Sequence, residues 1–229
     1  MYPCSGTIFE KSTTPLWKWF YAMYLFTTTR HGVPAKELER QLGVTYKCAW
    51  RMAHEIRKLM GEMDVGGLFG DVEVDETYIG GKRPGKRGRG ADGKTVVVGM
   101  KQRKDPVKTQ VVPNAKTKTI EPIVRDNVRQ GSSVHTDEWQ AYKNLIQRGY
   151  DHQSVNHGKK EWVRGDCHTN SIEGYWSRLK LSIRGTHVHV SERHLSKYLA
   201  EFDFRHNLRE SPDRMFSFLV DRLQNERPV

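Results

Sequence analysis

The sequence predicts a small all-α domain followed by a mixed α/β domain, and three observations support this. Apolar residues recur at helical spacing as far as about residue 60. Four glycines then fall between residues 61 and 70, which is typical of a linker. Beyond them, segments of alternating or β-branched residues are interleaved with helical segments, as expected of an α/β domain.

Three segments of the first domain have a helical pattern: 15–28, 35–42 and 45–60. Pro15 suits the first turn of a helix, where no backbone N–H is needed. Gly43 breaks the second segment, and Thr45 has the hydroxyl of an N-cap residue for the third. We therefore expect an irregular lead over residues 1–14 and a helical domain over residues 15–62.

The second domain is expected to cover residues 68–212. Five segments have the residue pattern of strands: 71–79, 94–100, 109–112, 133–137 and 151–155. Four others have the pattern of helices: 118–130, 139–148, 170–183 and 191–208. This order favours a sheet with helices packed on it, and residues 213–229 are expected to form a C-terminal tail.

The balance of charges points to a polyanionic partner. The net charge is +11 and the pI is near 9.6. Each phosphate that such a surface neutralises releases condensed counterions, which favours nucleic-acid binding. A basic, well-solvated surface is the alternative explanation. Hydrophobic residues make up 36% of the chain, which is enough to form a core.

The cysteines and the N-terminus favour a cytoplasmic protein. Cys4, Cys48 and Cys167 are far apart and form no CxxC pair, so we expect neither a zinc site nor a disulfide framework. The N-terminal segment lacks the pattern of a signal peptide. The apolar stretch over residues 16–26 is interrupted by Lys18 and is too short to span a bilayer, so no membrane association is expected.

Residues 35–57 resemble a helix-turn-helix, in which a tight turn joins two helices and the second enters the major groove of DNA. The side chains expected to face DNA are Thr45, Tyr46, Lys47 and Arg51. One departure is Glu39, which stands four residues before Gly43, where a small residue is usual. A plain helical hairpin used for packing is the alternative.

Three carboxylates stand out by their context. Asp75 lies in the alternating strand, Asp137 ends another strand, and Glu173 lies near the start of a helix. Residues placed in this way can converge on one point and bind Mg²⁺, which prefers oxygen ligands. Two such ions about 3.5–4 Å apart can hold the attacking and leaving oxygens of an in-line phosphoryl displacement.

Each carboxylate also has a simpler explanation. Asp75 is a charge near other acidic residues of its strand, and Asp137 could cap a helix that begins near Trp139. Glu173 follows Asn170 by three residues, which is capping-box spacing. The joint pattern favours a metal site over three separate structural roles.

Five stretches carry a resemblance to a known family: GTIFEKSTTPLWKWFYAMYLF, the helix-turn-helix segment, VEVDETYIGGK, VHTDEWQAYKNL and HTNSIEGYWSRLKLSIRGTHVHVS. With them the chain resembles insertion-sequence transposases of the ISXO-like group, within the RNase H-like superfamily that includes retroviral integrases. The resemblance covers about residues 6–209. It implies an RNase H-like mixed sheet and a DDE triad of Asp75, Asp137 and Glu173.

The resemblance also implies the reaction and its partners. Two Mg²⁺ or Mn²⁺ ions would support hydrolysis at the ends of the element, and the freed 3′-OH would attack target DNA. The partner would be double-stranded DNA, both terminal repeats and target, bound by a homodimer or a larger assembly. The setting would be a bacterial cytoplasm, in association with the nucleoid.

A lysine seven residues after the glutamate is a further feature that the resemblance implies, and Lys180 stands there. Nearly two helical turns separate Lys180 from Glu173, so both share a face about 10 Å apart, and the lysine could contact a phosphate. A solvated helix charge is the alternative. Some relatives use an asparagine as the third ligand, for which Asn170 is the candidate, but a carboxylate offsets metal charge better.

Relatives commonly carry a zinc ribbon before the GTIFEKS stretch, and here only Cys4 corresponds to one. We therefore expect either a shortened form or a start inside a longer gene. This departure raises a first alternative function, a truncated remnant that binds DNA without cutting it. A second alternative is an RNase H-like nuclease that cleaves strands without joining them.

The segment over residues 80–94 holds six basic residues and one aspartate, with glycines that predict a flexible hairpin tip. Five of these basic residues are expected to contact the DNA backbone without reading its sequence: Lys82, Arg83, Lys86, Arg87 and Arg89. A solvated mobile loop is the alternative.

Overall fold

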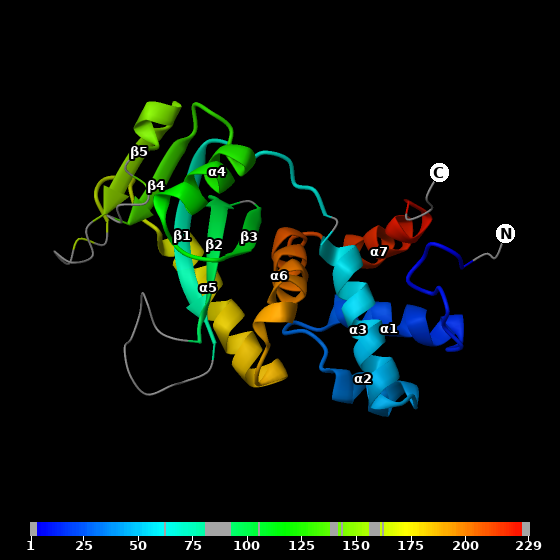
Figure 1. Cartoon of the computed structure of the whole chain (residues 1–229). Coiled ribbons are helices and arrows are strands. Elements are labelled where there is room, and N and C mark those ends of the chain that lie inside the picture. Colours follow the sequence, from blue (N-terminus) through cyan, green and yellow to red (C-terminus); the bar gives the residue numbers. More distant parts are fainter. Residues whose placement is uncertain are drawn as a thin grey trace. The chain divides into compact units, whose positions relative to one another are not determined.

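The computed structural model describes residues 4–61, 63–80, 93–104, 106–137, 142, 144–155, 161 and 163–225. The chain forms two compact units (Figure 1). We call the first the helical unit; its segments are Met1–Met63, Gly185–Val188 and Lys197–Val229. The second, the sheet unit, has the segments Asp64–Arg184 and His189–Ser196.

Three helices of the helical unit confirm the sequence prediction: α1 (Leu16–Thr28), α2 (Ala35–Leu42) and α3 (Tyr46–Gly61). Gly43 ends α2 in the left-handed region, with φ of 58°, where a glycine avoids the strain of a side chain. The backbone N–H of Cys48 donates to Thr45 Oγ1 at 3.3 Å, so Thr45 caps α3 as expected. The turn between α2 and α3 is therefore encoded locally.

The C-terminal region differs from the expected tail. Residues Arg214–Asn225 form α7, which contributes Met215, Leu219 and Leu223 to the core of the helical unit. These three residues recur every four positions, a helical pattern that the prediction overlooked. Ile8 and Phe9, from the expected irregular lead, also lie in this core.

The helix α6 (Glu192–Asn207) confirms the helix predicted over residues 191–208. That helix was expected to lie wholly in the second domain, but the two units divide it. Its residues from Lys197 onward belong to the helical unit. The reason is their burial, because Phe204 lies in the helical core and Glu201 forms an ion pair of 2.7 Å with Arg57 of α3.

The sheet unit contains one five-stranded mixed sheet, which confirms the predicted α/β class. Its strands are β1 (Asp71–Ile79), β2 (Thr95–Gln102), β3 (Val107–Val112), β4 (Ser133–Asp137) and β5 (Asp151–Val155). Their order is β3-β2-β1-β4-β5. The pairs β1–β2 and β2–β3 are antiparallel, whereas β1–β4 and β4–β5 are parallel.

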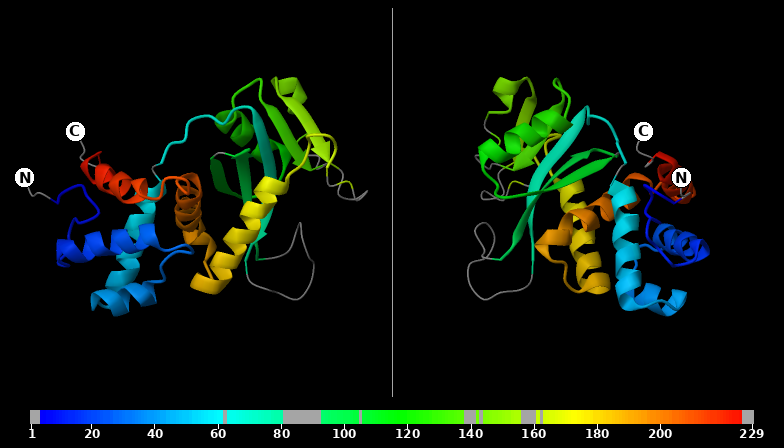
Figure 2. Two further views of the ribbon diagram at one scale, coloured as in Figure 1. Left: turned by 180° about the vertical axis from the view of Figure 1, so that it is seen from behind. Right: turned by 45° about the vertical axis from the view of Figure 1, so that its right-hand side comes forward.

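Helices cover both faces of this sheet, as Figures 1 and 2 show: α4 (Thr117–Asn127) lies on one face and α5 (Asn170–Ser182) on the other. The face under α4 is apolar, and its core includes Val74 of β1 and Val124 of α4. Because side chains alternate along a strand, Glu73 and Asp75 of β1 point to the α5 face. This alternation places carboxylates under α5.

Two other helical predictions have mixed outcomes. Much of the predicted helix over residues 139–148 lies outside the described residues, and its described end, Ile146–Arg148, is a short 3-10 helix. After α5 the chain continues as a π-helix over Ile183–His187 rather than stopping. None of the helices in the described part of the chain is both long and apolar enough to cross a bilayer.

Candidate active site

Asp75 lies in the middle of β1, half-buried beneath Trp176 of α5. The indole Nε1–H of Trp176 donates to Asp75 Oδ2 at 3.0 Å. Opposite Asp75, β2 carries Gly99, and a Cβ at this position would clash with the indole ring. The absence of a side chain at Gly99 therefore lets Trp176 reach the carboxylate.

Asp137 is the last residue of β4, the parallel neighbour of β1. The register pairs Glu73 with His135, which stand two residues before Asp75 and Asp137 on their strands. Residues that pair in this way point to the same face of a sheet. Asp137 is thus on the α5 side of the sheet, and it is half-buried.

Glu173 is in the first turn of α5 and is exposed. Thr169, which precedes the helix, donates from Oγ1 to Glu173 Oε1 at 2.7 Å. The N-cap residue of α5 is Thr169 rather than Asn170. Glu173 therefore stands four residues after the N-cap, whereas a capping box needs the glutamate three residues after it.

The three predicted residues interact electrostatically. Burial and, after it, the charges of Glu76, Asp137 and Glu173 together raise the pKa of Asp75 to about 8, while the Trp176 hydrogen bond opposes them. The charges of Asp137 and Glu173 therefore interact with that of Asp75 in the folded chain. Across the described ranges, no three His, Cys, Asp or Glu side chains are gathered closely enough to hold a metal ion.

Lys180 lies further along α5 and is half-buried. Burial lowers the pKa of its ammonium group, the charge of Asp75 opposes this shift, and the charges of Arg184 and Lys94 add to it. The ammonium group of Lys180 is therefore close enough to Asp75 for the two charges to interact.

The prediction missed a buried network around Glu73, whose side chain is 0% exposed. Glu73 Oε1 lies 3.1 Å from Arg103 Nε and 3.1 Å from His168 Nδ1, and Oε2 accepts backbone N–H bonds from the start of α5. A glutamate two residues before Asp75, on the same strand face, was the available signal. His168 is thus part of the same network as Arg103.

A second missed pair lies on the opposite face of β1. Tyr142 is fully buried and donates its hydroxyl to Glu76 Oε2 at 2.8 Å. Burial, followed by the charge of Glu76, raises the pKa of Tyr142 well above its usual value. The tyrosine therefore remains a hydrogen-bond donor and holds Glu76 within the α4 face.

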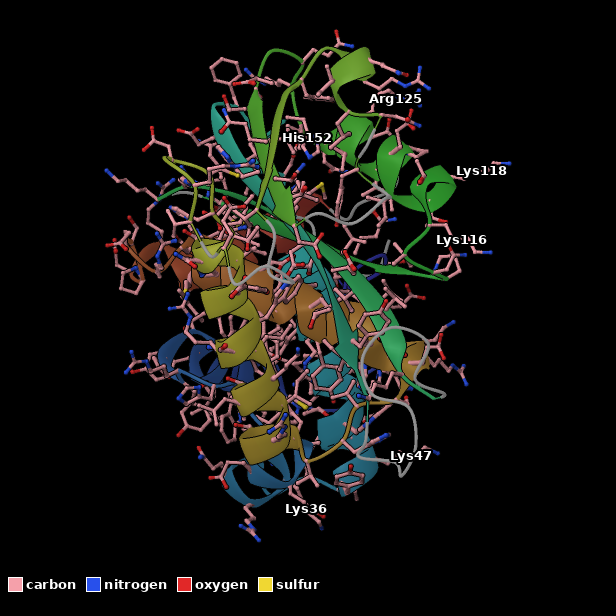
Figure 3. The ribbon with its side chains drawn as sticks, turned by 90° about the vertical axis from the view of Figure 1, so that its left-hand side faces the viewer. Lys36, Lys47, Lys116, Lys118, Arg125 and His152 are labelled. Carbon is pink, nitrogen blue, oxygen red and sulfur yellow. The ribbon has the colours of Figure 1, made fainter. Side chains whose placement is uncertain are left out.

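The predicted DNA-facing residues of α3 differ in exposure. Thr45, Tyr46 and Lys47 are exposed, and Lys47 extends from the surface in Figure 3. Arg51 is half-buried, and its Nη2 donates to the carbonyl of Glu10 at 2.7 Å. The five basic residues predicted to contact DNA between Lys82 and Arg89 lie outside the described residues.

Exposed basic side chains also occur on α4, which the prediction did not single out. Lys118 and Arg125 stand seven residues apart on this helix and point outward, with Lys116 just before its start (Figure 3). They add to the positive charge of the sheet unit.

Residues 67–207 match the family described as the ISXO2-like transposase domain. The chain belongs to this family. The matched segment contains the whole sheet, α5 and α6, and therefore Asp75, Asp137, Glu173 and Lys180. The resemblance stated from the sequence motifs is confirmed.

Two curated relatives point to the same class. This ISXO2-like transposase is 28% identical to an uncharacterized protein in transposable element ISH50 of Halobacterium salinarum, over 92% of this chain and 76% of the relative. It is 30% identical to an uncharacterized transposase-like protein of Haemophilus influenzae, over 44% of this chain and 80% of the relative. The family and these relatives identify an insertion-sequence transposase.

Proposed function

We propose that this ISXO2-like transposase cuts DNA at the ends of its element and joins the freed strands to target DNA, using Asp75, Asp137 and Glu173 as ligands for divalent metal ions. The observation that carries the proposal is the interaction of Asp75 with both other carboxylates, although they come from a different strand and from a helix. The five-stranded mixed sheet with a carboxylate-bearing helix on one face supports it, because the sequence resemblance implies an RNase H-like fold of this kind.

The donor set suits magnesium or manganese. Carboxylate oxygens are hard ligands, and several of them in one neighbourhood repel one another unless a cation offsets their charge. The raised pKa of Asp75 reflects such repulsion in addition to burial. When bound, two ions would activate a water or 3′-OH nucleophile and stabilise the leaving oxygen of the phosphodiester.

The residues of the chain have distinct roles in this proposal. Trp176 restrains the carboxylate of Asp75 through its indole N–H. Glu173 is exposed at the helix start, where it has room to change rotamer and complete the ligand set. Lys180, on the same helix as Glu173 and close enough to Asp75 for their charges to interact, contacts a DNA phosphate through its ammonium group.

We further propose that α2 and α3 act as a helix-turn-helix. The left-handed Gly43 and the Thr45 cap make the tight turn between the two helices. At the start of α3, where a recognition helix contacts base edges, the exposed residues are Thr45, Tyr46 and Lys47. Arg51 lies one turn further along, and the basic residues between 82 and 89 would contact the phosphate backbone. The partner is double-stranded DNA, bound as a homodimer or larger assembly on the nucleoid.

The test is cleavage of element-end DNA in the presence of Mg²⁺. Asp137→Asn keeps the shape of the side chain and removes its charge, so we expect cleavage to fall at least about 100-fold. Asp126→Asn is the matched control, because Asp126 is exposed on α4, and it should cleave like the wild type. Normal cleavage by Asp137→Asn would refute the proposed chemistry.

Joining is measured separately, with DNA ends that are already cut. A transposase forms strand-transfer products from these ends, and the same Asp137→Asn variant should fail to form them. Cleavage by the wild type without any strand-transfer product would indicate a nuclease. Sequence-specific binding without cleavage would indicate a DNA-binding remnant.

A further inference from the structure

The first turn of α5 is held on β1 by a buried carboxylate. Glu73 Oε2 accepts hydrogen bonds from the backbone N–H groups of Ser171, at 2.8 Å, and of Ile172, at 3.0 Å. These N–H groups have no partner within the helix, and the positive end of the helix dipole favours an anion there. Glu73 thus anchors the helix that carries Glu173.

Arg103 links the same carboxylate to the segment before α5. Its Nε lies 3.1 Å from Glu73 Oε1, and its Nη2 donates to the carbonyl oxygens of Asp166, at 2.6 Å, and His168, at 3.3 Å. The guanidinium therefore fixes the chain that leads into the helix and offsets the charge of the buried glutamate.

We propose that Glu73, supported by Arg103, is a positioning residue that sets the separation between the carboxylates of Asp75 and Glu173. This inference rests on the proposed function. Glu73 stands two residues before Asp75 on the same strand face, and it binds the helix one and two residues before Glu173. It thus links β1 directly to the first turn of α5, two elements that are remote in sequence.

The link matters because metal ligands tolerate little displacement. A ligand set must hold its geometry within about 0.5 Å, and a rigid helix transmits a shift of its first turn directly to Glu173. A buried charge pair is otherwise a weak source of stability, because desolvation offsets much of its attraction. Positioning of α5 gives this buried charge a role beyond its small contribution to stability.

The test is Glu73→Gln, read by the stabilisation that Mn²⁺ gives to the purified full chain. A cation that binds only the folded state raises its melting temperature according to the ratio of its concentration to its dissociation constant. We expect the Mn²⁺ concentration for half-maximal stabilisation to rise about tenfold, the effect typical of losing a residue that orients metal ligands. In cleavage assays kcat should fall while KM for DNA stays unchanged.

Glu201→Gln is the matched control. Glu201 is equally buried, at 0% exposed, and forms ion pairs of 2.7 Å with both Arg57 and Arg205 in the helical unit. Its loss should lower the melting temperature without changing the Mn²⁺ concentration for half-maximal stabilisation. This control separates loss of stability from loss of positioning.

The outcomes are distinguishable. If Mn²⁺ stabilises the wild type and Glu73→Gln equally at each concentration, the positioning role is wrong while the proposed function stands. If Mn²⁺ does not stabilise the wild type and Asp137→Asn cleaves normally, both fail. If Glu73→Gln does not fold, Arg103→Lys is the second variant. It keeps a cation near Glu73 but loses the hydrogen bonds from the guanidinium to the carbonyl oxygens before α5. The Mn²⁺ concentration for half-maximal stabilisation should then rise as well, but by less than tenfold.

Discussion

Asp75→Asn should stabilise the metal-free protein, and increasingly so as the pH rises. The pKa of Asp75 is raised from 3.8 to about 8 by burial and by neighbouring acids. The folded state therefore holds the proton more tightly than the unfolded state does, so ionisation of Asp75 costs stability as the pH rises from about 4 to about 8. Asparagine has the same shape, can still accept the Trp176 hydrogen bond, and carries no charge.

The magnitude follows from the size of the shift. About four pKa units at 1.36 kcal/mol each correspond to an upper bound of about 5 kcal/mol at pH 8. Even a third of this, about 2 kcal/mol, would raise the melting temperature by roughly 4–8 °C in a chain of this size. Near pH 4 both side chains are neutral, so the two proteins should melt within about 1 °C of each other.

The assay is thermal unfolding in EDTA between pH 4 and pH 8.5, followed by circular dichroism. Asp126→Asn, which changes an exposed acid on α4, should track the wild type at every pH. Saturating Mg²⁺ should reverse the order at pH 8, because only the wild-type carboxylate binds the cation. A stability difference that does not depend on pH would refute the reasoning.

Three further predictions concern neighbouring positions. Gly99→Ala should lower stability by about 1–3 kcal/mol in denaturant titrations and reduce cleavage, because the new Cβ meets the Trp176 ring. Gly174→Ala, within α5 but with no atom near its Cβ position, should instead raise stability by about 0.5–1 kcal/mol; a loss would show that α5 is packed differently. Lys47→Ala should weaken binding to double-stranded DNA and reduce the salt slope by about one, measured by fluorescence anisotropy at several salt concentrations; an unchanged slope would remove Lys47 from the interface.

The elements that could be predicted from the sequence are those with local signals. Alternation along β1 and β-branched residues in β2 identify strands without reference to the rest of the chain. Gly43 and Thr45 likewise mark a helix end and a helix start through their own backbone and hydroxyl chemistry. The placement of Asp75 and Asp137 on strands and of Glu173 on a helix was also predicted, because it depends on element type, while their role as metal ligands stays a prediction.

The features that could not be predicted depend on contacts between distant segments. Glu201 places the second half of α6 in the helical unit because it pairs with Arg57, which lies 144 residues earlier. Glu73 anchors α5 through N–H groups 98 and 99 residues away. In the sequence alone both glutamates look like ordinary solvated charges, since their partners are fixed only by the tertiary fold.

The most direct test of the central claim is to locate Mn²⁺ in crystals of the full chain by its anomalous scattering. The account predicts a peak bounded by oxygens of Asp75, Asp137 and Glu173, about 2.0–2.2 Å from each ligand oxygen. Crystals of Asp137→Asn grown in the same way should lose the peak or show it weakened. A well-ordered Mn²⁺ bound elsewhere, with no metal contact from any of these three carboxylates, would contradict the proposed metal site.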